Sequence, residues 1–196
     1  MSIHLRLNEG MKLTKGIITF GIILMIVGLT LAYSFQTPPE EERIEKNPSS
    51  FILEEKEIYN VIKIKEKYSV PVTRFAEKIN ENVEKLTTWK YEKGSGARYK
   101  DVSQEFELII AKFSTIEGAD HTFDSIVENL NKRIGKTLIS EVGRERGVFW
   151  GRENIDKVVF RESNLIVLLE GELPVEEVEM YSEMIEDKIH QTLREH

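Results

Sequence analysis

The chain has 196 residues, a formal charge of −7 and no cysteine. If about 50 residues form an anchor and a linker, the remainder is of ordinary size for one domain. Without cysteine there can be no disulfide, thiolate metal site or lipoprotein anchor. The acidic balance would repel phosphate backbones, so we expect no nucleic-acid binding.

An uninterrupted apolar stretch runs from Gly16 to Phe35 and contains no charged residue. At a rise of ~1.5 Å per residue, a helix of this length spans about 30 Å, the thickness of a bilayer's hydrocarbon core. Residues 1–15 carry a charge of +2 and the rest of the chain −9, with three glutamates at 40–42. The positive-inside rule therefore predicts a cytoplasmic N-terminus and an outer C-terminal domain. We expect a single-pass protein of the cell membrane that contacts the lipid bilayer through residues 16–35.

Two alternatives to a retained transmembrane helix can be considered. A buried core helix is disfavoured by the length and uniform apolarity of the stretch. A cleaved signal peptide is the stronger alternative, because Ala32 and Ser34 offer small residues at the spacing of a cleavage site. However, the stretch is longer than the ~7–15 apolar residues usual in signal peptides, which favours retention.

Residues 36–50 have the composition of a short acidic linker. Pro38 and Pro39 cannot continue a helix, and the glutamates after them favour water. The predicted organisation is therefore a cytoplasmic segment at 1–15, a transmembrane helix at 16–35, the linker at 36–50 and an extracytoplasmic domain at 51–196.

The first part of this domain shows weaker patterns than the rest. Alternation predicts a strand over 58–65, although a helix through 51–62 is also compatible. Residues 88–92 are expected to form a strand, and Gly94-Ser-Gly-Ala97 a turn. Between the two strands a helix is expected, with Thr73 as a cap and with apolar positions at Phe75, Ile79, Val83 and Leu86.

The clearest pattern begins at residue 105. Phe106–Phe113 is apolar on both faces, which is typical of a central strand, and Ser114 and Glu117 have the spacing of a capping box. The helix that follows should end at Gly135, and its apolar stripe comprises Ala119, Phe123, Ile126, Val127, Leu130 and Ile134.

The C-terminal part predicts a further strand at 138–142, a hairpin and a last helix. Strands at 156–161 and 164–170 flank a turn at Glu162-Ser163. The last helix begins at Pro174, and its apolar face comprises Val178, Tyr181, Ile185, Ile189 and Leu193. The whole order predicts an α+β fold, in which an N-terminal transmembrane helix precedes an antiparallel sheet packed against about three helices on one face.

No motif specifies a reaction, a metal or a cofactor, and we expect none of these. His4, His121, His190 and His196 lack the spacing of a known metal motif. His121 and Asp124 could share a cation, but a solvated first helical turn explains them better. Gly94-Ser-Gly lacks the lysine of a P-loop, and the nucleophile motif GxSxG is absent.

The segment from Val142 to Trp150 is the best candidate for a contact with a partner. Its glycines let the backbone approach a neighbour, and arginine beside tryptophan is typical of binding hot spots. The alternative is a plain hairpin with core aromatics and glutamate-paired arginines. The predicted contact residues are Arg144, Arg146, Phe149, Trp150 and Arg152.

The soluble part, from about residue 55 to 195, also resembles a family of uncharacterised prokaryotic, chiefly archaeal, extracytoplasmic proteins with an N-terminal anchor. The resemblance implies the α+β fold and the placement outside the membrane, but no activity. Where the family has Gly-Asp after a Val-Gly turn, this chain has Gly143-Arg144. The matching segments are Ala97–Tyr99, Ile110–Ala119, Glu141–Gly143, Val159–Arg161 and Asn164–Val167.

These observations favour a membrane-tethered extracytoplasmic binding or interaction module, without catalytic activity, whose partner is an envelope or membrane protein. The alternative is a sensor or carrier domain that holds a small molecule between helix and sheet. An enzyme ranks third, because no constellation of acid, base and nucleophile stands out. The sequence does not indicate an oligomeric state.

Overall fold

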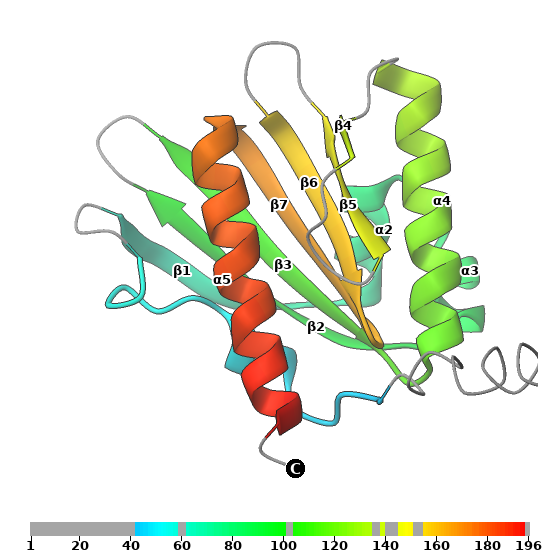
Figure 1. Cartoon of the computed structure of the whole chain (residues 1–196). Helices are drawn as coiled ribbons and strands as arrows, with labels where there is room; N and C mark the ends of the chain where they lie inside the picture. The colour runs from blue at the N-terminus through cyan, green and yellow to red at the C-terminus, as the bar shows by residue number, and fades with distance from the viewer. Residues whose placement is uncertain are drawn as a thin grey trace, which may run out of the picture. The chain divides into compact units, whose positions relative to one another are not determined.

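The computed structural model describes residues 42–58, 62–100, 104–134, 138–139, 145–150 and 155–194. They belong to one compact unit, Glu42–His196. The described strands form one antiparallel sheet of seven strands in the order β1-β2-β3-β7-β6-β5-β4 (Figure 1). They are β1 Lys63–Val70, β2 Tyr91–Lys100, β3 Glu105–Phe113, β4 Leu138–Ile139, β5 Glu145–Trp150, β6 Ile155–Glu162 and β7 Leu165–Leu173.

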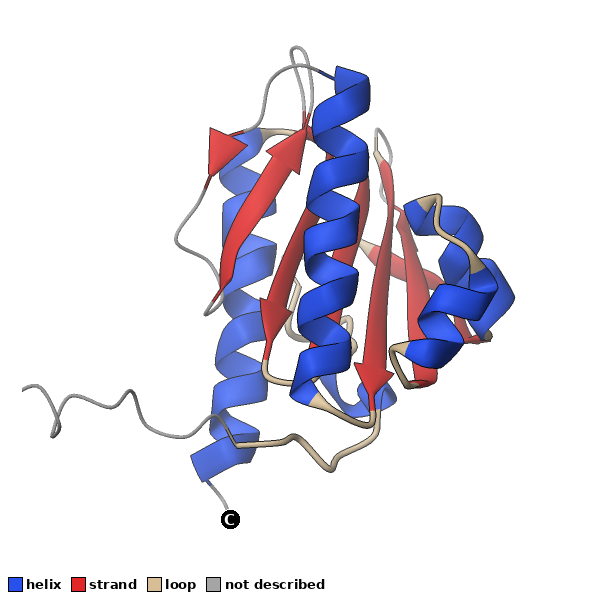
Figure 2. Ribbon diagram, turned by 90° about the vertical axis from the view of Figure 1, so that its right-hand side faces the viewer, coloured by secondary structure: helices blue, strands red, loops and turns tan. Residues whose placement is uncertain are grey.

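Helices cover both faces of this sheet, whereas the sequence predicted a cover on one face only. Helix α5 and the short 3-10 helix η1 lie on one face, and α2, α3 and α4 lie on the other (Figures 1 and 2). The helices are η1 Pro48–Phe51, α2 Val72–Ile79, α3 Val83–Thr88, α4 Ile116–Ile134 and α5 Val175–Arg194.

The helical layer on the second face of the sheet follows from the central strands, which are apolar on both faces. In β3, Leu108 and Ile110 join the core beneath α5, while Ile109 and Ala111 join the core beneath α4. Because successive side chains of a strand point to opposite faces, both cores need a helical layer to exclude water. The α+β class and the antiparallel sheet are confirmed, and the one-sided cover was wrong.

The predicted transmembrane segment 16–35 lies outside the described residues. Among the helices that the structure describes, none has both the length and the apolar character required to cross a bilayer.

The strongest sequence patterns correspond closely to the observed elements. Strand β3 lies between β2 and β7 in the sheet, and β6 and β7 form the predicted hairpin. Its turn places Ser163 in the left-handed region at φ 54°. Along α5, the predicted apolar face is buried at Val178, Tyr181, Ile185 and Ile189.

The largest local difference concerns the predicted turn at Gly94-Ser-Gly-Ala97, which lies in the middle of β2. Its glycines serve close packing: a Cβ on Gly94 would lie 2.5 Å from the Tyr91 hydroxyl oxygen, and one on Gly96 2.5 Å from the Tyr68 ring. β1 also lies later than the predicted strand over 58–65.

The helix boundaries differ as well. The expected helix over 73–86 is divided into α2 and α3, because Asn80 adopts the left-handed conformation that ends α2. Pro71, not Thr73, occupies the N-cap position of α2. At the start of α4, Thr115 Oγ1 accepts the Gly118 N–H at 3.1 Å, in place of the predicted capping box.

The compact unit begins at Glu42, within the segment predicted as a linker. Ile44 is 1% exposed and joins the core beneath α5, and η1 begins at Pro48. A single apolar residue among charged neighbours shows no periodicity, so its burial was not predictable from the local sequence.

Candidate functional site

The predicted partner contact falls on β5 and its flanks. Arg144 and Arg152 lie outside the described residues. Arg146, Phe149 and Trp150 lie on β5, of which the structure describes the backbone only. In the register, Phe149 is opposite Leu138 of β4 and Val158 of β6, and Trp150 is opposite Lys157. The role of these residues therefore stays a prediction.

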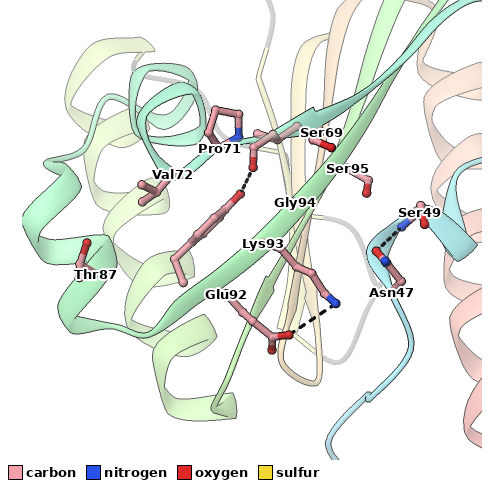
Figure 3. Close-up of a pocket in the computed structure, with 12 residues that line it drawn as sticks. Asn47, Ser49, Ser69, Pro71, Val72, Thr87, Glu92, Lys93, Gly94 and Ser95 are labelled. Atoms are coloured by element: carbon pink, nitrogen blue, oxygen red, sulfur yellow. Dashed lines mark hydrogen bonds and ion pairs between the residues drawn. The ribbon is translucent and has the colours of Figure 1, made fainter.

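An open hollow of about 690 Å³ lies where β1 ends and β2 begins. Val72 and Thr87, from α2 and α3, lie on one side of it, and Asn47 and Ser49 lie on the other (Figure 3). Strand residues form the wall between them, and these are Ser69, Val70, Tyr91, Glu92, Lys93, Gly94 and Ser95.

The hollow arises because β2 continues past the end of β1. The β1–β2 pairing ends at Val70 and Gly94, while the β2–β3 pairing continues to Tyr91 and Phe113. Pro71 follows β1 directly and leads the chain away from the sheet into α2. Residues 91–93 therefore project beyond their neighbouring edge strand and line the hollow.

Tyr91 fixes the inner wall of the hollow. Its hydroxyl donates a hydrogen bond of 2.6 Å to the carbonyl oxygen of Val70, and its ring stacks on Phe75 with centroids 5.5 Å apart. Burial raises the pKa of Tyr91 above its ordinary value. The hydroxyl thus stays neutral and continues to donate at physiological pH.

Charged side chains lie at one end of the hollow. Lys93 Nζ is 3.6 Å from Glu92 Oε1, and the Nζ of Lys112 is 3.7 Å from Glu92 Oε2. The Lys112 side chain is 2% exposed, and it donates to the carbonyl oxygen of Glu45 at 2.8 Å. With the hydroxyls of Ser49, Ser69, Ser95 and Thr87, the lining offers both donors and acceptors.

A buried carboxylate, Glu107 of β3, organises the adjacent part of the sheet. Two cations one helical turn apart on α2 contact it: Arg74 Nη2 at 3.0 Å from Oε1 and Lys78 Nζ at 2.5 Å from Oε2. Arg98 Nε of β2 donates to Oε1 at 3.2 Å, and the hydroxyl of Tyr68 also donates to it.

Burial alone would raise the pKa of Glu107, but the hydrogen bonds from Lys78 and Tyr68 and the nearby cations outweigh it and hold the pKa at about 2. Burial and the hydrogen bond to Glu107 raise the pKa of Tyr68. Although burial lowers the pKa of Lys78, its bonds to Glu107 and Glu170 raise it overall. At neutral pH Glu107 and Lys78 are therefore charged, and the Tyr68 hydroxyl stays protonated and donates to Glu107.

This cluster also fixes one wall of the hollow. Arg74 and Lys78 attach α2 to the sheet, and Val72 at the start of α2 lines the hollow. Lys157 extends the cluster, because its Nζ donates to the Lys78 carbonyl oxygen at 3.0 Å and lies 3.4 Å from Glu170 Oε1. The cluster was not predictable from the sequence, because its members come from six separate elements.

The fold therefore defines an α+β protein with a central antiparallel sheet between two helical layers and a hollow of mixed polar and apolar lining at one edge. No protein-family model and no curated protein sequence matches the chain. Its structure is similar to the crystal structure of the extracellular domain of PknH from Mycobacterium tuberculosis, with a TM-score of 0.54 and 11% sequence identity. The match covers 78% of this chain and 100% of that one, and at this identity it concerns the fold alone.

Proposed function

We propose that the chain is a membrane-tethered binding module, without catalytic activity, whose folded unit lies outside the cytoplasm and takes a small polar ligand at its sheet edge. The observation that carries the proposal is the hollow of about 690 Å³ between α2, α3 and η1. This volume falls within the ~300–1,000 Å³ usual for small-molecule sites.

Two further observations support the placement. The apolar stretch 16–35, with basic residues before it and glutamates after it, is typical of an anchor with the C-terminal part outside. The structural neighbour is an extracellular domain as well. Both features are compatible with a binding unit held near the outer surface of a membrane.

The chemistry of the lining indicates the kind of ligand. Hydroxyl groups and the amide of Asn47 surround the hollow, and one acid and one base, Glu92 and Lys93, stand side by side. Such a lining has hydrogen-bonding capacity for an uncharged or zwitterionic polar molecule, and Val70, Val72 and Tyr91 add apolar surface beside these groups.

The full chain, purified in detergent micelles, allows a direct test. Native mass spectrometry would look for a co-purified small molecule, and ligand-observed NMR would then screen polar metabolites. Ser95→Trp should fill the hollow and weaken binding at least tenfold, while Lys100→Trp, an exposed position on the same strand, should bind as the wild type does. Equal affinity in both variants, or no bound molecule at all, would exclude this site.

A second candidate function is the docking of a partner protein along β5. The pairing of β5 with β6 shifts register between Glu145 and Val148, and such bulges often redirect side chains near the edge of a sheet. Arg146 lies within this bulge. Crosslinking of a neighbouring protein through β5, with a hollow that binds nothing, would favour this function over the first.

A further inference from the structure

Three side chains with metal-binding atoms converge between the β6–β7 hairpin and α5. They are Glu162 at the end of β6 and Glu186 and His190 on α5, and one ligand atom from each lies within 4.8 Å of the other two. Glu162 Oε1 is 3.2 Å from His190 Nε2. The three residues belong neither to the hollow nor to the Glu107 cluster.

All three residues lie on regular secondary structure, Glu162 on β6 and the other two on α5. Glu186 and His190 are one turn apart, so both project from the same side of α5. Glu162 is paired with Leu165 in the hairpin register, next to the tight turn at Ser163. Two ligands one turn apart on a helix, with a third from a strand, can close around an ion with small side-chain rotations.

Burial distinguishes this cluster from ordinary acidic groups at the surface. The Glu162 side chain is 2% exposed and the His190 side chain 34%. A carboxylate at this depth is stabilised by ion pairs or hydrogen bonds, and a bound cation would add to those that Glu162 already makes. A divalent ion would neutralise both carboxylates while the imidazole stays neutral and acts as a ligand.

We infer that Glu162, Glu186 and His190 form a binding site for a divalent transition metal, most suitably Zn²⁺. One imidazole nitrogen and two carboxylate oxygens are a ligand set that Zn²⁺ accepts, with a fourth position left for water or another molecule. The bound ion joins α5 to the β6–β7 hairpin. From the sequence we expected no metal, because the four histidines lack the spacing of a known metal motif.

The chain contains a matched control for this site. Glu117 and His121 on α4 have the same spacing, with Glu117 Oε1 3.6 Å from His121 Nε2, but their side chains are 83% and 53% exposed. Among the described residues, no third metal-binding side chain joins this pair in a comparable cluster. The two pairs therefore separate the effect of the buried Glu162 from that of a simple helical Glu–His pair.

Metal binding is tested by titrating the full chain in detergent with ZnCl₂, by isothermal calorimetry and thermal unfolding. We expect one saturable site, and a rise in Tm of about 5–10 °C when free Zn²⁺ exceeds Kd about 100-fold. His190→Gln and Glu186→Gln should each weaken binding at least tenfold and remove the Tm shift. His121→Gln and His196→Gln should leave both unchanged, and MgCl₂ should not reproduce the shift.

Co²⁺ gives a second readout, because its visible absorption reports coordination number and the presence of a nitrogen ligand. The wild type should give a low-coordinate Co²⁺ spectrum that His190→Gln removes. Unsaturable Zn²⁺ binding, or binding that survives the His190→Gln/Glu186→Gln double substitution, would overturn the site. In that case the His190–Glu162 contact would be an ion pair only.

Discussion

The side-chain amide of Asn164 both accepts a hydrogen bond from the backbone of Ile44 and donates one to it, although the two residues are 120 positions apart in the sequence. Its Oδ1 accepts the Ile44 N–H at 2.8 Å, and its Nδ2 donates to the Ile44 carbonyl oxygen at 3.3 Å and to the Phe113 carbonyl oxygen at 2.6 Å. The side chain is fully buried. One asparagine in the β6–β7 turn therefore attaches the first described residues to the centre of the sheet.

Asn164→Ala should lower the free energy of unfolding by about 2–4 kcal/mol, because it leaves three buried backbone groups without their partner. Asn164→Asp should also destabilise the fold, since it retains the acceptor but loses both donated bonds. Urea unfolding followed by circular dichroism measures the change. Asn129→Ala is the control, because its amide makes one exposed bond of 3.4 Å. An Asn164→Ala variant as stable as the control would show that this attachment is unimportant.

Glu107 should make stability depend on pH in the acid range. Its folded pKa of about 2 lies below the ordinary value of 4.5. The contribution of its ionised form to the free energy of unfolding is therefore complete above pH 4.5 and is lost as the pH falls from 4.5 towards 2. Because solvent screens the partly exposed cations around it, we expect a total of about 1–3 kcal/mol.

Glu107→Gln should accordingly be less stable than the wild type at pH 7, and its stability should fall less steeply between pH 4.5 and 2. Urea unfolding at a series of pH values gives both slopes. Glu179→Gln, on the exposed side of α5, is the control and should keep the wild-type slope. If Glu107→Gln and the wild type have parallel pH profiles, the cluster contributes nothing to acid stability.

Gly96 is needed for space beneath the Tyr68 ring, because a Cβ there would lie 2.5 Å from Tyr68 Cζ. We expect Gly96→Ala to cost about 1–3 kcal/mol through overpacking. In a double-mutant cycle, Tyr68→Ala should relieve most of this cost, whereas Tyr68→Phe should not, since it retains the ring. Equal costs of Gly96→Ala in all three backgrounds would contradict the steric explanation.

The same glycines show where the sequence was informative. Apolar periodicity predicted β3, the β6–β7 hairpin and α5, because in those elements the signal is carried by neighbouring residues. Gly94 and Gly96 were predicted as a turn, but they are needed for close packing, Gly94 against the Tyr91 hydroxyl and Gly96 against the Tyr68 ring, and no local pattern reveals these contacts. The hollow and the Glu107 cluster were not predicted either, because each combines residues from separate elements and leaves no local pattern. The helix i,i+4 pair Glu186–His190 was visible in the sequence, but its third residue was not.

The predicted contact on β5 gives a separate expectation. Trp150→Ala and Arg146→Ala should reduce capture of a neighbouring protein in crosslinked native membranes, without loss of folded protein. Lys100→Ala, on the exposed part of β2, is the control and should leave capture unchanged. A large fall in Tm for Trp150→Ala would instead identify the indole as part of the core and exclude it as a contact.

The proposed topology can be tested with single cysteines, because the natural chain has none. Lys93→Cys, at an exposed position beside the hollow, should react with a membrane-impermeant maleimide in intact cells. Ser2→Cys should react only after the membrane is permeabilised, since the basic segment 1–15 is expected to face the cytoplasm. Gel mobility of the same samples distinguishes a retained helix from a cleaved signal peptide, because cleavage shortens the chain and retention does not. Labelling of Ser2→Cys in intact cells, or protection of Lys93→Cys, would reverse the proposed orientation and exclude an extracytoplasmic ligand for the hollow.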